Sequence, residues 1–167
     1  MALISSGRLT DDPWVTAADG EALAASGPVV VSLDRWRAER DALLARGGLL
    51  GIRLASSQLA GEIAADLAHF DLVALEFPTF RDGRAYSTAR LLRERYGFAG
   101  ELRAVGNVLR DQFMFMHRCG FDAFEVADER QVEAWRTAMD EISVWYQPAT
   151  DGRVPATTLR HFRSAAE

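Results

Sequence analysis

Short runs of apolar residues alternate with longer amphipathic stretches over most of the chain. The runs are nearly continuous and rich in branched side chains, as in Val29–Leu33, which is typical of strands buried in a parallel sheet. The stretches between them are long enough to hold a helix that returns the chain across the sheet. We therefore predict five strands, at residues 29–33, 49–55, 72–77, 102–105 and 123–126.

Helix signals fill the stretches between the predicted strands. Asp34 can cap a helix over residues 35–46 that a glycine pair ends, and residues 84–96 carry a second amphipathic pattern that also ends at a glycine. Asp128 resembles the first residue of a capping box that opens a helix to about Val144.

A further helix is expected between the second and third strands. Ser56 or Ser57 can cap it. Leu59, Ile63 and Leu67 follow at a spacing of four residues, which would place them on one buried face.

Strands and helices that alternate with short loops predict a mostly parallel sheet with right-handed crossovers. We favour an α/β fold with an open, flavodoxin-like sheet of about five strands, flanking helices and a small N-terminal hairpin. The alternative is a partial (β/α) barrel, because four such units make half of an eight-unit barrel. The expected organisation is an N-terminal hairpin or extension (1–27), an α/β domain (28–147) and a flexible C-terminal tail (148–167).

Composition narrows the possible functions. The net charge of −5 argues against nucleic acid and anionic membranes as partners. All 19 basic residues are arginine, which excludes lysine Schiff-base chemistry and a P-loop lysine. One cysteine excludes an internal disulfide, and the three histidines lack the spacing of metal ligands. No apolar run approaches the roughly 18 residues of a membrane span and no signal peptide is evident, so a cytoplasmic protein without a metal site is expected.

The candidate binding site is the joint between the third strand and the following helix, residues 77–84. Ligands of parallel α/β sheets bind beyond the C-terminal ends of the strands. Backbone amides at a helix start and the guanidinium groups of two arginines favour a small anion there. The alternative is a plain turn with solvated arginines. The candidate anion-binding residues are Arg81, Asp82, Gly83, Arg84 and Asn107, the last also predicted to cap the next helix.

Three charged residues stand inside the apolar strands, and Glu125, in the short fifth strand, is expected to be exposed. Arg53 lies in the second predicted strand and Glu76 in the third. A charge in such a position is either at an edge or paired, so we expect a buried Arg53–Glu76 ion pair across the sheet.

The fourth predicted helix is apolar nearly all round because of the sequence Phe113-Met114-Phe115-Met116. Such a helix is buried on two sides or faces a partner. We expect Phe113 and Met116 to be buried in the subunit, and Met114 or Phe115 to contact a second protein, most simply in a homodimer.

Five stretches of the sequence resemble a known family: FRDGR (80–84), ARLLRER (89–95), GELRA (100–104), LRDQ (109–112) and RCGFD (118–122). They are similar to a bacterial domain-of-unknown-function family, number 934. The resemblance covers roughly residues 29–147. Ala85 departs from it, because a glycine is expected there. Members of this family are described as oxidoreductases involved in sulfite reduction and tend to be encoded beside assimilatory sulfite reductase.

The resemblance implies an accessory protein of assimilatory sulfite reduction, acting as a non-catalytic partner of sulfite reductase or of a related sulfur-assimilation protein. The alternative is a small-anion-binding protein or an oxidoreductase with its site at residues 77–84. The sequence holds no GxGxxG, GxxxxGK or CxxC motif. The choice between an enzyme with an unknown cofactor and a non-catalytic partner therefore stays open.

Overall fold

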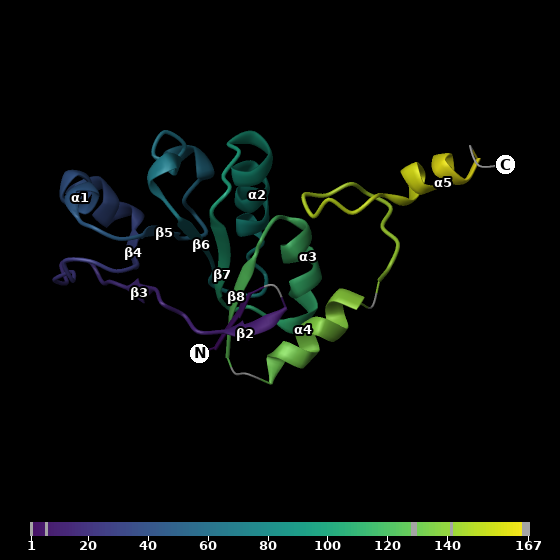
Figure 1. Ribbon diagram of the computed structural model, residues 1–167, viewed down its shortest axis with the longest axis horizontal. Coiled ribbons are helices and arrows are strands. Elements are labelled where there is room, and N and C mark those ends of the chain that lie inside the picture. Colours follow the sequence, from purple (N-terminus) through teal and green to yellow (C-terminus); the bar gives the residue numbers. More distant parts are fainter. Residues whose placement is uncertain (1, 6, 128–129, 141, 165–167) are drawn as a thin grey trace.

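A computed structural model describes residues 2–5, 7–127, 130–140 and 142–164 of the chain. Within these residues one sheet of eight strands runs in the order β2-β1-β8-β7-β6-β5-β4-β3 (Figure 1). The five predicted strands are confirmed as β4 to β8. The strands are β1 (Ala2–Ser5), β2 (Arg8–Thr10), β3 (Val15–Thr16), β4 (Val29–Ser32), β5 (Leu50–Leu54), β6 (Leu72–Phe77), β7 (Glu101–Gly106) and β8 (Ala123–Val126).

The strand order makes this sheet a curled, open half-barrel. From β3 to β8 each strand lies parallel to the one before it in the sequence. Right-handed crossovers that always advance in one direction leave every helix on the same face. A flavodoxin-like sheet reverses direction and places helices on both faces. The mixed α/β class with flanking helices is confirmed, but the flavodoxin-like order and the number of strands are wrong.

The N-terminal hairpin is present and extends the main sheet. Gly7 has a φ of 74°, which suits the tight turn between β1 and β2. β1 then pairs antiparallel with β8. The hairpin therefore closes one edge of the sheet, and β3 forms the other edge.

Helices cover one face of the sheet (Figure 1). Ser32, and not Asp34, caps α1, because its hydroxyl accepts the amide N–H of Arg35 at 3.0 Å. The helix expected to run to about Val144 ends at Asp140 as α4, and Asp128 lies outside the described residues. The helices are α1 (Leu33–Ala45), α2 (Arg84–Arg90) with a π-helical turn η3 (Leu91–Arg95), α3 (Phe113–Arg118), α4 (Gln131–Asp140) and α5 (Ala156–Ser164).

The prediction of a helix between β5 and β6 is wrong. Two short 3₁₀ turns, η1 (Ala60–Glu62) and η2 (Leu67–His69), take its place, and Leu59 is 66% exposed. The side chains of Gln58 and Glu62 accept the backbone N–H groups three residues before them, at 2.8 and 2.7 Å. These local bonds compete with the helical pattern and favour tight turns.

The prediction that Asn107 caps the next helix is also wrong. The backbone N–H of Asn107 donates to the carbonyl of Phe77 at 2.7 Å, which ties this residue to the end of β6. The chain then makes a 3₁₀ turn, η4 (Arg110–Gln112), before α3 begins at Phe113.

The segment expected to be a tail contacts the end of α3 and then forms α5. The Thr150 hydroxyl donates to the carbonyl of Arg118 at 2.8 Å. The Arg118 guanidinium lies 4.1 Å from the ring centre of Trp145 and 3.5 Å from the Asp151 carboxylate.

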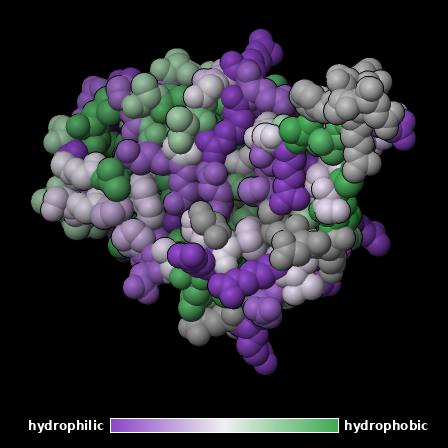
Figure 2. Space-filling model, turned by 45° about the vertical axis from the view of Figure 1, so that its right-hand side comes forward, coloured by the Kyte–Doolittle hydropathy of each residue, from purple (hydrophilic) through white to green (hydrophobic). Residues whose placement is uncertain are grey.

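Alternate residues of each strand point to opposite sides of the sheet. One set packs beneath the helices in the main core, together with aromatic residues such as Phe113 and Trp135. The other set forms a small apolar cluster, which Trp14 partly covers. We call this second side the open face. On the outer surface shown in Figure 2, a band of hydrophilic residues separates smaller hydrophobic patches. The open-face cluster consists of Val30, Leu72, Ala74 and Val105.

Candidate functional site

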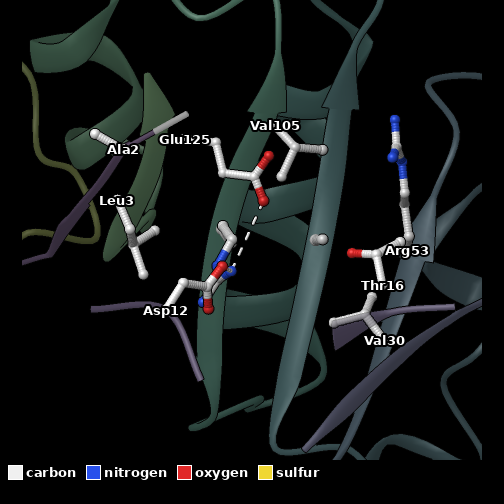
Figure 3. A pocket seen from close by; sticks show the side chains of 10 residues that line it. Ala2, Leu3, Asp12, Thr16, Val30, Arg53, Val105 and Glu125 are labelled. Carbon is white, nitrogen blue, oxygen red and sulfur yellow. Dashed lines mark hydrogen bonds and ion pairs between the residues drawn. The ribbon is translucent and has the colours of Figure 1, made fainter. Parts of the chain in front are cut away.

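A cavity of about 400 Å³ lies on the open face. Residues of the N-terminal segment, among them Asp12 and Thr16, form part of its wall, and β4 to β8 supply the rest. In Figure 3 Asp12 and Glu125 come together on one side, while Thr16, Val30 and Arg53 stand on the other. The lining residues are Ala2, Leu3, Asp12, Thr16, Val30, Arg53, Ala74, Arg103, Val105 and Glu125.

The strand register explains why there is space here. Arg53 of β5 pairs with Ala74 of β6, which in turn pairs with Arg103 of β7. The three side chains therefore form one row across the open face. The small Ala74 between two long arginines leaves room that a larger side chain would fill.

Arg103 is the central charged residue of the cavity. It is 2% exposed, and its Nε donates to Glu101 at 2.8 Å. Its Nη1 donates to Asp12 at 2.7 Å and lies 3.7 Å from Glu125, the contact dashed in Figure 3. Its Nη2 is buried and has no hydrogen-bond partner among the described residues. One edge of the guanidinium is thus enclosed by protein, while the Nη1 side meets the two carboxylates of the cavity lining.

Hydrogen bonds and burial shift the pKa values of Arg103 and Glu125 in this cluster. Burial would lower the pKa of Arg103, but its hydrogen bonds to Asp12 and Glu101 outweigh burial and raise the pKa above its ordinary value. Burial raises the pKa of the Glu125 carboxyl, and the nearby Arg103 only partly offsets this. Arg103 therefore stays charged, while Glu125 is ionised at a cost.

Trp14 and Asp12 hold the segment that closes this side of the cavity. The backbone N–H of Trp14 donates to the Asp12 carboxylate at 3.1 Å. The Trp14 ring lies over Gly51, where an added Cβ would come within 3.1 Å of the ring. A side chain at Gly51 would crowd the ring, so the glycine lets Trp14 lie close to the sheet, two residues after Asp12.

The structure pairs Arg53 with Glu76, as the sequence suggested. Their closest nitrogen and oxygen atoms are 3.0 Å apart. The side chains are 41% and 30% exposed, so the pair lies at the rim of the open face and is not buried.

At the joint 77–84, Arg84 is already engaged. Its guanidinium contacts the Asp82 carboxylate at 2.6 Å and the Ser56 hydroxyl at 2.9 Å. The hydrogen bonds from Arg84 and then from Ser56 hold the pKa of Asp82 well below its ordinary value. Gly83 precedes α2, and Arg81 is exposed. The structure brings Asn107 near this joint through its bond to Phe77, and the anion site stays a prediction.

The candidate interface residues differ sharply in exposure. Phe113 and Met116 are fully buried, Met114 is 6% exposed and Phe115 is 60% exposed. Phe115 is thus the member of this run that a second protein could contact.

Two kinds of site are not found in the described part of the chain. No group of three His, Cys, Asp or Glu side chains there could hold a metal ion. None of the helices that the structure describes is long and apolar enough to cross a membrane.

Sequence reasoning missed Arg103 and Asp12 as site residues and treated Glu125 as exposed. Arg103 and Glu125, like Arg53 and Glu76, are charges inside otherwise apolar strands, and that signal was available. Asp12 carried none, because it contacts a residue 91 positions away in the sequence.

A family model described as bacterial protein of unknown function (DUF934) matches residues 51–157. No curated protein matches the chain. The family match includes Arg53, Arg103 and Glu125, whereas Asp12 lies outside it.

Proposed function

The chain belongs to the DUF934 family of bacterial proteins, and we propose that it is a small-molecule-binding accessory protein of assimilatory sulfite reduction. The binding site in this proposal is the cavity of the open face. One observation supports the binding role above all others: two guanidinium groups, of Arg53 and Arg103, and two carboxylates, of Asp12 and Glu125, converge on one cavity of about 400 Å³. A concave site with a few convergent polar groups beside an apolar lining is typical of small-molecule binding.

The place in sulfite reduction is supported by the family resemblance of residues 80–84 and the stretches after them. In this proposal the protein is a non-catalytic partner of sulfite reductase or of a related sulfur-assimilation protein. The exposed Phe115 ring is the proposed contact for that partner or for a second copy of the chain.

A small-anion or oxidoreductase site at the joint 77–84 is the alternative. Arg81 supports it, because this guanidinium is exposed just before α2. Arg84 weakens it, because Asp82 already neutralises this guanidinium and Ser56 accepts a hydrogen bond from it. The cavity is therefore the stronger candidate.

Filling the cavity tests the binding role in cells. Ala74→Phe places a ring between Arg53 and Arg103 and removes no charge. We expect the variant to slow growth on sulfate as sole sulfur source and to leave growth on cysteine unchanged. Ala65→Phe, at an exposed position, is the matched control. Normal growth of a folded Ala74→Phe strain on sulfate would contradict the proposal, with the fold checked by circular dichroism of the purified protein.

Affinity capture tests the partner role. Tagged full-length protein from sulfate-grown cells should co-purify with sulfite reductase, as identified by mass spectrometry. Phe115→Ser should reduce the recovered reductase at least fivefold without lowering the yield of the tagged protein. Recovery of no sulfur-assimilation protein, in repeated captures at low salt, would rule against this part of the proposal.

A further inference from the structure

The charged residues that line the open-face cavity sum to zero but are unevenly placed. Two carboxylates, of Asp12 and Glu125, balance two guanidinium groups, of Arg53 and Arg103. Arg103 lies with both carboxylates on one side, whereas Arg53 stands on the other (Figure 3). A ligand with a net charge would leave that charge uncompensated in such a cavity. A ligand without net charge, whose own charges are aligned with those of the wall, gains an attraction at both sides.

Glu125 is the acidic group that is available to a ligand. Both oxygens of the Asp12 carboxylate are engaged, because one accepts the Trp14 N–H at 3.1 Å and the other accepts from Nη1 of Arg103 at 2.7 Å. The same Nη1 is 3.7 Å from the Glu125 carboxylate, which is longer than a hydrogen bond. The Glu125 side chain is 22% exposed and lines the cavity, so a donor from a ligand can reach it.

Arg53 is the basic group that is available on the other side. Its Nη2 contacts the Glu76 carboxylate at 3.0 Å. A guanidinium has five N–H donors, so this contact leaves donors that can hold a second carboxylate. The Arg53 side chain is 41% exposed and also lines the cavity.

We propose that the cavity binds a small zwitterion whose ammonium and carboxylate groups stand at opposite ends of a short carbon chain. The ammonium donates to Glu125, and the carboxylate accepts from Arg53. Val30, Ala74 and Val105 supply the apolar wall against which the chain packs. This inference rests on the proposed function, since it requires that the cavity is a ligand site.

The separation of the two charged residues decides the length of the ligand. Glu125 lies on β8 and Arg53 on β5, with β7 and β6 between them. Three strand spacings place their backbones about 14 Å apart along the sheet. In Figure 3 the Glu125 side chain points toward Val105, whereas the Arg53 side chain extends along its own strand. An α-amino acid carries both charged groups on one carbon atom and is therefore too short to meet both residues, whereas an ω-amino acid can.

Calorimetric titration of the full chain at pH 7 tests the inference with defined probes. 4-Aminobutyrate carries both charged groups at the ends of its chain. Butyrate lacks the ammonium, butylamine lacks the carboxylate, and glycine has both groups on one carbon atom. We expect 4-aminobutyrate to bind at least tenfold more tightly than each of the other three. Equal or tighter binding of any of the three would overturn the inference, and so would the absence of 4-aminobutyrate binding at millimolar concentration.

Two charge variants link the binding to the cavity. Glu125→Gln should remove most of the advantage of 4-aminobutyrate over butyrate, and Arg53→Met should remove most of its advantage over butylamine. The matched controls are Glu94→Gln and Arg90→Met, because these two residues pair in the helix layer, and both advantages should persist in them. Unchanged advantages in Glu125→Gln and Arg53→Met would overturn the assignment to the cavity. The growth defect of Ala74→Phe reports separately on the cavity as a ligand site. A defect without 4-aminobutyrate binding would therefore reject the zwitterion and keep the proposed function.

Discussion

The two faces of the sheet are built from the same strands but have opposite characters. In β7, Leu102 and Ala104 point under the helices and belong to the main core, whereas Glu101, Arg103 and Val105 point to the open face. The covered face is apolar and filled by helix side chains. The open face combines charges with a cavity. The helix layer thus supplies the stability that lets the other face keep charged groups and empty space.

Two arginines show the same contrast at a smaller scale. Arg93 uses all three nitrogens: its Nε bonds to Gly120, its Nη1 to the carbonyls of Phe98 and Gly100, and its Nη2 to Asp122. It joins loops of the protein itself. Arg103 is more deeply buried, yet its Nη2 has no acceptor in the part of the chain that the structure describes. Arg93 therefore links loops of the covered side through all of its nitrogens, whereas Arg103 meets the carboxylates of the open face through Nε and Nη1 alone.

The largest expected effect is on the covered face. Phe124 is fully buried, and its ring lies 5.3 Å from that of Phe113 and 5.9 Å from that of Trp135. Phe124→Ala should lower the free energy of unfolding by about 4 kcal/mol, because it removes a core ring and leaves a void. Val105→Ala on the open face should cost about 1.5 kcal/mol or less, since it removes only two methyl groups beside an existing cavity. Urea denaturation measures both, and equal costs would remove the energetic distinction between the faces.

The sequence predicts those parts of the fold that depend on residues close together in the chain, and not those that depend on distant ones. The strands β4 to β8 were predicted because each is an apolar run of its own. The strand order was not, because nothing in a run such as Leu72–Phe77 says on which side the next strand will lie. The turns at Gln58 and Glu62 were missed because side chains there compete with a regular apolar spacing.

The candidate site also has a part that could be predicted from the sequence and a part that could not. Arg53 and Glu76 could be paired from the sequence, since they occupy similar positions in consecutive strands that prove to be neighbours. The contact of Arg103 with Asp12 depends on where the fold returns the N-terminal segment. It could not be predicted without the order of the strands.

An intermediate effect is expected from removing the central cation of the open face. Arg103→Met leaves Asp12, Glu101 and Glu125 without their shared partner. The variant should lose about 3 kcal/mol of stability, near the lower limit for breaking a buried ion pair, because the carboxylates keep some access to water. Arg53→Met, at the exposed rim, should cost under about 1 kcal/mol.

The pH dependence separates this effect from simple loss of packing. At pH 5 protonation of the unpaired carboxylates should recover part of the stability of Arg103→Met, as measured by urea denaturation at pH 5 and pH 7. A cost that is the same at both values would show that the side chain acts by its volume and not by its charge.

The smallest expected effect concerns Glu125, and the direction of the stability change follows from the pKa of this residue. Burial raises the pKa of its carboxyl in the folded protein. A carboxyl whose folded pKa is above its unfolded value, near 4.3 for glutamate, favours the folded state at low pH, and this contribution is lost as the pH rises through the folded pKa. Glutamine has no such loss. Glu125→Gln should therefore gain stability relative to wild type between pH 4 and pH 7, by under about 1 kcal/mol, because Asp12 and Glu101 still pair with Arg103. Urea denaturation across this range, with Glu94→Gln as control, measures the difference. If Glu125→Gln is less stable than wild type at pH 7, then Glu125 is a structural partner of Arg103. The charges of the open face would then stabilise the fold, as the hydrogen bonds of Arg93 do.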